Sequence, residues 1–276
     1  MSLASYCETL PEPRLDLSAK IARVQTYIAQ KCSTSSAKDT ALQALATIQT
    51  ALKIPREAQL YAALSEAFIS NMLVEVNEAH EIASPLYILE FFGGKAMDLF
   101  IVVLLALSEV RGGFEQLCYL NFDLDPGIPG AQNITIDLSS DSMFLLTHLQ
   151  TLPMGYPMGI MMRGPIAPVI SADEDTATAP PCCKLNSFYA TTLPALSAGR
   201  SVAWQILTHY RSEAERIGTA LEADPLRMNL QSFPFEDETE EPETLLSFTT
   251  GPILIARPAS AAYSSTSALT PSPDKL

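Results

Sequence analysis

Apolar residues recur at helical spacing over most of the first 112 residues. The pattern predicts helices from Asp16 or Ser18 to about Lys31, from about Lys38 to Lys53, and from Arg56 to about Ala79. The stretch from Ala96 to Val110 is apolar on nearly every side, so we expect a helix at the centre of the core. The apolar segment from Leu86 to Phe92 is too short for its period to distinguish a helix from a strand.

The period changes after Gly113. Alternating residues predict strands at Leu117 to Leu124 and Asn133 to Leu138, joined by a turn at Asp125-Pro126-Gly127. Further strand candidates lie at residues 159–163, 184–193, 226–233 and within 245–256. One long helix is predicted from Arg200 to Leu221, where apolar residues again follow helical spacing.

Helices first and strands later predict an α+β fold. We expect an N-terminal helical bundle or layer, followed by a mixed, largely antiparallel sheet with one long helix packed on it. Regular alternation of strands and helices is missing from the pattern, which argues against a doubly wound sheet. The expected organisation is a flexible tail at 1–14, a helical region at 15–112, an α+β region at 113–258 and a disordered tail at 259–276.

The chain is acidic, with a formal net charge of −14 and an isoelectric point near 4.6. Such a field repels phosphate backbones and anionic lipid, so we expect no nucleic-acid partner, and basic proteins are the favoured partners. The longest apolar run, Leu99 to Leu107, has nine residues, whereas a membrane span needs about 20, so no membrane insertion is expected. The N-terminus lacks a signal-peptide pattern and the five cysteines are scattered. Both observations favour a cytoplasmic or nuclear protein that is not secreted.

Motifs for nucleotides and metals are absent. Neither G-x-x-x-x-G-K-[ST] nor G-x-G-x-x-G occurs, and the closest approach, Gly93-Gly94-Lys95, is interpreted as a helix junction. We therefore expect no P-loop or Rossmann enzyme and no cofactor. The three histidines are far apart and no metal-ligand spacing is present, so no metal site is predicted either.

Nucleophilic catalysis has one weak candidate. Cys182 or Cys183 could act as a nucleophile with His209 as the base. The acidic residues at 173–175 would raise the pKa of a thiol there, which argues against this chemistry. The favoured interpretation is that both cysteines are ordinary residues at the start of a strand.

Two unusual segments are candidate contact surfaces for another protein. One is acidic and bounded by phenylalanines, and the other is rich in methionine, which adapts to irregular contacts. The alternatives are a solvated hairpin loop for the first segment and core packing for the second. The candidate partner-binding residues are Phe233, Phe235, Glu236, Asp237, Glu238, Glu240, Glu241, Met154 and Met158.

The scarcity of catalytic motifs leads to a functional hypothesis. The chain is predicted to be a non-enzymatic protein–protein interaction subunit or adaptor of a larger assembly. Two alternatives stay open: a cysteine- or serine-dependent hydrolase or transferase of unfamiliar layout, and a self-assembling structural protein that forms a homo-oligomer.

Overall fold

The fold was obtained as a computed structural model of the whole chain. It describes residues 16–72, 85–110, 112–138, 142–152, 158–163, 188, 192–198, 200, 202–208, 211–221, 228–235 and 242–250. The predicted tails, residues 1–14 and 259–276, lie outside the described residues.

Three helices open the described chain, as the sequence predicts: α1 (Leu17–Lys31), α2 (Ser35–Ala51) and α3 (Pro55–Met72). The first two begin at side-chain caps. The Asp16 carboxylate accepts the backbone N–H of Ala19 at 2.7 Å, and the Thr34 hydroxyl accepts that of Ala37 at 3.2 Å. Each cap satisfies a backbone donor that the first helical turn would otherwise leave unpaired.

A seven-stranded sheet follows, in the spatial order β3-β2-β1-β4-β5-β7-β6. Strands β1 to β5 are parallel to one another, and β7 runs antiparallel to both β5 and β6. The strands are β1 (Leu86–Phe91), β2 (Leu117–Asp123), β3 (Gln132–Thr135), β4 (Met158–Arg163), β5 (Val202–Thr208), β6 (Asn229–Phe233) and β7 (Glu243–Thr250).

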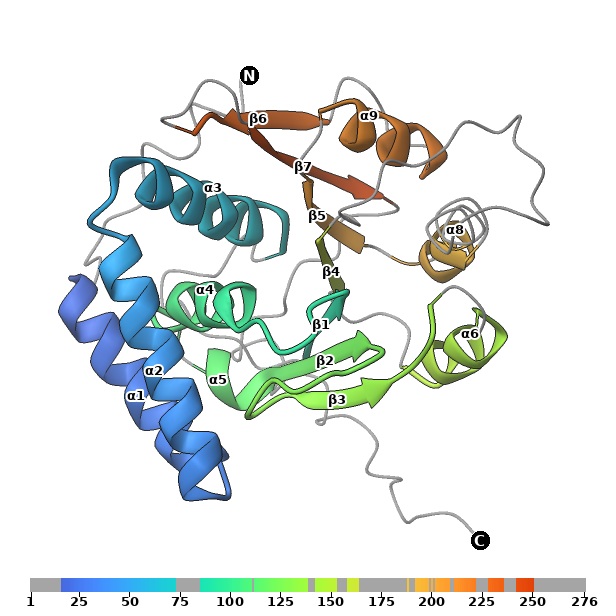
Figure 1. The fold of residues 1–276 in the computed structure, drawn as a ribbon. Helices are drawn as coiled ribbons and strands as arrows, with labels where there is room; N and C mark the ends of the chain where they lie inside the picture. The colour runs from blue at the N-terminus through green and yellow to red at the C-terminus, as the bar shows by residue number, and fades with distance from the viewer. Residues whose placement is uncertain are drawn as a thin grey trace, which may run out of the picture.

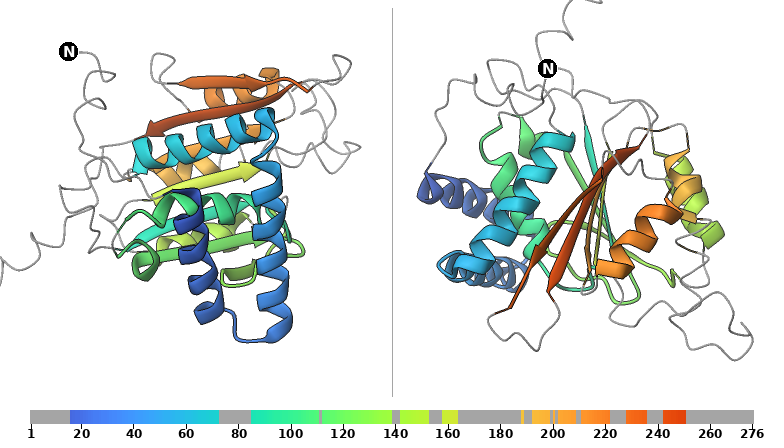
Figure 2. Two further views of the ribbon diagram at one scale, coloured as in Figure 1. Left: turned by 90° about the vertical axis from the view of Figure 1, so that its left-hand side faces the viewer. Right: turned by 90° about the horizontal axis from the view of Figure 1, so that it is seen from above.

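Helices cover both faces of this sheet (Figures 1 and 2). One face carries α1, α2, α3 and α4 (Asp98–Leu107), and the other carries α6 (Ser142–Gln150), α8 (Leu193–Ser197) and α9 (Arg211–Ala220). The short α5 (Gly113–Gln116) leads directly into β2. Two apolar clusters result, one on each face, so the described chain forms a three-layer α/β structure.

The largely antiparallel sheet predicted from the sequence is wrong, and so is the argument against a doubly wound fold. The predicted turn at 125–127 does not form a hairpin, because β2 and β3 lie parallel with Leu120 opposite Gln132. The predicted long helix from Arg200 to Leu221 is instead strand β5 followed by helix α9. All seven residues of β5 are buried, and a strand buried on both faces shows no alternation that would separate it from a helix.

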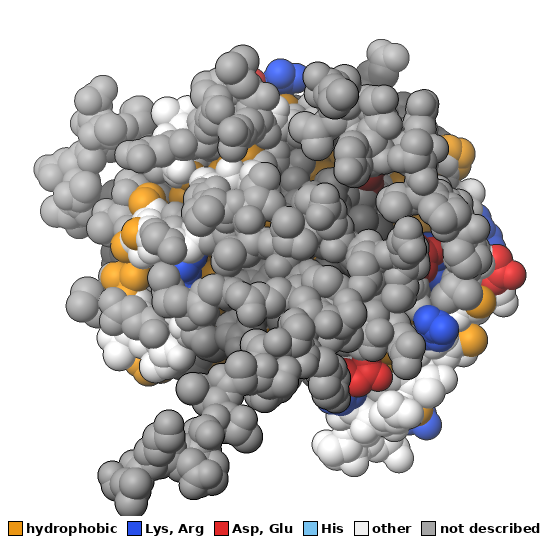
Figure 3. Space-filling model, turned by 180° about the vertical axis from the view of Figure 1, so that it is seen from behind, with side chains coloured by type: hydrophobic (Ala, Val, Ile, Leu, Met, Phe, Trp, Pro, Cys, Tyr) orange, Lys and Arg blue, Asp and Glu red, His pale blue; other side chains and the backbone are white. Residues whose placement is uncertain are grey.

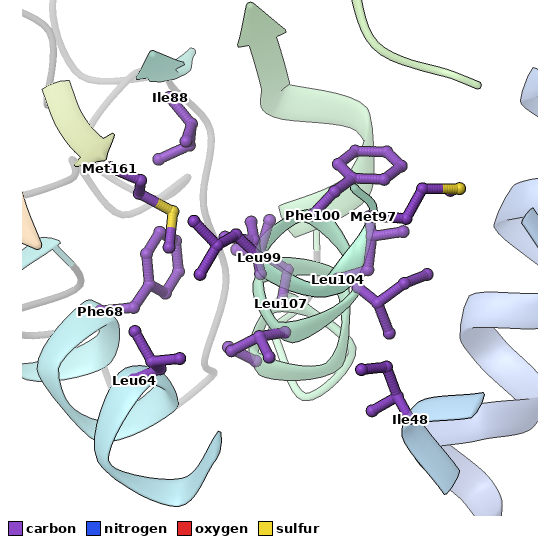
Figure 4. Close-up of a cluster of buried hydrophobic side chains, with 14 of the residues drawn as sticks. Ile48, Leu64, Phe68, Ile88, Met97, Leu99, Phe100, Leu104, Leu107 and Met161 are labelled. Atoms are coloured by element: carbon purple, nitrogen blue, oxygen red, sulfur yellow. The ribbon is translucent and has the colours of Figure 1, made fainter. Parts of the chain in front are cut away.

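The expectation of a helix within the apolar stretch at 96–110 is confirmed by α4. The segment at 86–92, which the sequence left undecided, contains β1. Helix α4 lies between the sheet and the N-terminal helices, where Leu104 and Leu107 pack among side chains of those helices (Figure 4). Within the described residues, no helix combines the length and apolar content that crossing a membrane would require.

Candidate functional site

The direction of the chain through the sheet changes between β1 and β4. From β1 the chain adds β2 and β3 on one side, and it then returns to add β4 and β5 on the other. In open α/β sheets, ligands bind beyond the carboxyl ends of the strands at such a switch point. The residues that end β1 and β2 therefore form the candidate site. This carboxyl-edge site consists of Glu90, the turn at 92–95, Asn121 and Asp123.

The turn from β1 to α4 has an unusual backbone. Phe92 lies at φ 63° and Gly94 at φ 56°, both in the left-handed region. A side chain in that region costs about 1–2 kcal/mol, so Phe92 stores strain that its surroundings must offset. Such strain is a feature of sites whose geometry serves a ligand.

Gly93 lies between two buried polar side chains. A Cβ atom placed on Gly93 would be 2.6 Å from Glu90 Oε1 and 2.9 Å from Asn121 Oδ1. Both of these side chains are completely buried. Only glycine therefore lets the turn approach the ends of β1 and β2 so closely.

The Gly94 peptide is held on both sides. Its N–H donates to Asp123 Oδ2 at 3.1 Å, and its carbonyl accepts the Asn121 side-chain amide at 2.8 Å and the Gly127 N–H at 2.9 Å. The other oxygen of Asp123 accepts the N–H of Asp125 at 3.0 Å. The half-buried Asp123 carboxylate thus joins the turn after β1 to the loop after β2.

Glu90 accepts a hydrogen bond from Tyr119 of the neighbouring strand, whose O–H donates to Glu90 Oε2 at 2.7 Å. Burial, the neighbouring Glu90 charge and this hydrogen bond together raise the pKa of Tyr119 well above its ordinary value. Tyr119 therefore remains protonated at neutral pH and acts as a hydrogen-bond donor.

The electrostatic character of the site is negative. Within the described segments 90–98 and 121–127, four residues are acidic, Glu90, Asp98, Asp123 and Asp125, and one is basic, Lys95. Lys95 pairs with Asp125 at 2.5 Å, but both side chains are largely exposed, so solvent screens that pair. Asp98 occupies the first turn of α4, where a bound phosphate would otherwise face the helix dipole.

Of the residues that the sequence singled out, the structure describes Met158, Phe233 and Phe235, and none of these three belongs to the carboxyl-edge site. The Phe233 side chain is buried at the end of β6 and that of Met158 within β4, so neither lies on the surface. Phe235 stacks on the guanidinium of Arg56, 3.8 Å from the ring centre. Met154, Cys182, Cys183, His209, and the acidic residues Glu236, Asp237, Glu238, Glu240 and Glu241 lie outside the described residues.

In the part of the chain that the structure describes, no group of three His, Cys, Asp or Glu residues could hold a metal ion. The carboxyl-edge site itself was missed because Gly93-Gly94 was compared only with phosphate-binding motifs. An acidic residue at the end of a short apolar segment, followed by paired glycines and then an apolar helix, was the available signal.

Comparison with known proteins gives matches at the level of fold. No protein-family model and no curated protein sequence matches the chain. An rRNA methylase from Streptococcus thermophilus shares 9% identity at a TM-score of 0.36, covering 68% of this chain and 94% of the other. A release-factor-specific protein-(glutamine-N5) methyltransferase from Alicyclobacillus acidocaldarius shares 13% identity at a TM-score of 0.32, covering 68% and 90%. Both of these solved structures are described as methyl-transferring enzymes, and the likeness names no substrate and no contacting residue of this chain.

The comparisons differ from the functional expectations. The matched solved structures are described as enzymes that transfer methyl groups, so the hypothesis of a non-enzymatic interaction subunit or adaptor is not retained. One of them is described as an rRNA methylase, so the exclusion of nucleic-acid partners is not retained either. Acidic and basic side chains of the described residues lie close together on the face seen from behind (Figure 3).

Proposed function

We propose that the chain is a methyltransferase that binds S-adenosylmethionine at the carboxyl-edge site. The observation that carries this proposal is the pair of carboxylates, Glu90 and Asp123, at the ends of neighbouring parallel strands. Glu90 lies against Gly93, where an added Cβ would collide with it, and Asp123 accepts the backbone N–H of the next residue, Gly94. A methyl donor bound there supplies an activated methyl group, and the residues of the chain bind and orient it.

Asp123 suits the ribose of a nucleoside. It ends the strand next to β1, and in doubly wound folds an acidic residue at that position accepts hydrogen bonds from ribose hydroxyls. Both of its oxygens already accept backbone N–H groups, which fixes the carboxylate in one orientation. A carboxylate oxygen can accept more than one hydrogen bond, so capacity for hydroxyl groups remains.

The charge of the site favours a cationic nucleoside over a phosphorylated one. Dinucleotides and ATP bring negative phosphates, which need a glycine-rich phosphate loop and an unblocked helix N-terminus. Here the first turn of α4 carries Asp98, and Glu90 and Asp123 add further negative charge. S-adenosylmethionine carries a sulfonium and an ammonium group, and both are attracted by such a field.

The proposal is tested by equilibrium dialysis of the full chain with labelled S-adenosylmethionine, with NAD and ATP as competitors. We expect saturable binding that neither NAD nor ATP displaces. Asp123→Asn should weaken binding about tenfold, because it removes a charged acceptor of hydrogen bonds.

Asp125→Asn is the matched control for this experiment. It removes one negative charge two residues away, but the Asp125 side chain is 77% exposed and its backbone N–H is retained. Binding by this variant should change by less than about twofold. The absence of saturable binding by the wild-type chain, or equal displacement by NAD, would rule the proposal out.

A further inference from the structure

The hydrogen bond from Tyr119 to Glu90 lies beneath the proposed contacts with the nucleoside and connects Glu90 to β2. The Tyr119 hydroxyl hydrogen-bonds the Glu90 carboxylate at 2.7 Å, and both side chains are shielded from water. A buried carboxylate loses the hydration that stabilises its charge, and a donated hydrogen bond restores part of that stabilisation. The stabilisation of the Glu90 carboxylate therefore depends on a residue of the neighbouring strand β2.

The Tyr119 ring is itself fixed. It packs edge-on against Phe100 of α4 with ring centres 4.8 Å apart, and its exposed fraction is 4%. In the sheet register Ile88 lies opposite Tyr119 and Glu90 opposite Asn121, so the hydroxyl reaches along the strands to the end of β1. The hydrogen bond consequently defines one orientation of Glu90.

The other side of Glu90 is equally restricted. The space between its carboxyl group and the backbone of Gly93 is too small for a methyl group, since an added Cβ would lie 2.5 Å from Glu90 Cδ. The carboxylate is thus confined between Tyr119 and the turn that enters α4. Loss of the tyrosine hydroxyl would remove a hydrogen bond that fixes the orientation of this carboxylate.

We infer that Tyr119 is a positioning residue that holds the Glu90 carboxylate in one orientation, so that the site selects a cationic nucleoside over a neutral one. This inference rests on the proposed function. The selectivity for positive charge then depends on Tyr119 of β2, a residue that does not touch the ligand.

The test compares two ligands on the full-length chain. S-adenosylmethionine is cationic, whereas 5′-methylthioadenosine keeps the adenosine and lacks the sulfonium and the amino-acid end. Tyr119→Phe should weaken binding of the first about tenfold and leave that of the second within about twofold. Tyr27→Phe is the matched control, because it removes the hydroxyl of another buried tyrosine that packs on Phe114 of α5, and both affinities should be retained.

Glu90→Gln provides a second variant, which should reproduce the selective loss while keeping the shape of the side chain. Equal affinities in wild type and Tyr119→Phe, or a parallel loss of both ligands, would overturn the inference and leave the proposed function standing. If the wild-type chain bound both ligands equally, the inference would also fail, although the nucleoside site would stand. Failure of the wild-type chain to bind either ligand would remove the proposed function and the inference together.

Discussion

Replacement of Gly93 by alanine tests the geometry of the carboxyl-edge site directly. The added methyl group would lie 2.5 Å from Glu90 Cδ and 2.6 Å from Glu90 Oε1, far inside the normal contact distance. Relief requires Glu90 to leave its rotamer, at about 0.5–1.5 kcal/mol, and to give up the hydrogen bond from Tyr119, at about 1.5–3 kcal/mol. We expect Gly93→Ala to lower the free energy of unfolding by about 2–4 kcal/mol, measured by urea denaturation.

Gly94→Ala is the control, because it changes the neighbouring residue without a collision. The nearest atom to an added Cβ is Asp123 Oδ2 at 3.9 Å, so the cost comes only from the positive φ of 56°. That cost is about 1–2 kcal/mol. The explanation from close approach would be refuted if Gly93→Ala were no more destabilising than Gly94→Ala.

Two further predictions concern parts of the chain away from this turn. Arg56→Ala should destabilise the protein by about 1–3 kcal/mol in urea, because it leaves Glu243 and Glu57 without their partner at half-buried positions. Arg211→Ala, which breaks only the exposed pair with Glu215, should cost less than about 0.5 kcal/mol, and a similar cost for Arg56→Ala would contradict the assignment. Burial, followed by the charges of Cys32 and Cys118, raises the pKa of Tyr27 from 10.0 to about 12. Between pH 10 and 12 the Tyr27 hydroxyl keeps its proton in the folded state and loses it in the unfolded chain. The free energy of unfolding should therefore be highest below pH 10 and fall by about 3 kcal/mol between pH 10 and 12. Unfolding followed across that range should show the decline in wild type and a shallower one in Tyr27→Phe.

Local patterns were sufficient for several elements. The Asp16 cap and the apolar spacing behind it predict α1, because helix formation depends on residues three and four positions apart. Apolar spacing alone predicts α2 from about Lys38, three residues after its observed start at Ser35. The apolar stretch at 96–110 likewise contains the central helix α4, since a segment without a polar face must be buried on all sides.

The direction of the strands was decided only by tertiary structure. A hairpin and a parallel crossover can share the same alternating pattern, and β2 and β3 show this clearly. Their turn residues suggested an antiparallel pair, yet the loop carries the chain back so that β3 adds in parallel. Strand β5 was mistaken for a helix because its side chains are buried in the apolar clusters on both faces of the sheet. Burial on both faces removes the alternation that identifies a strand.

The sequence by itself determined an acidic chain with an apolar core, capped N-terminal helices and a central buried helix. Tertiary structure alone decided where the candidate site lies. Glu90 and Asp123 are 33 positions apart, and no local pattern relates them. They become neighbours because β1 and β2 are parallel and adjacent, so the carboxyl ends of both strands meet at one edge of the sheet.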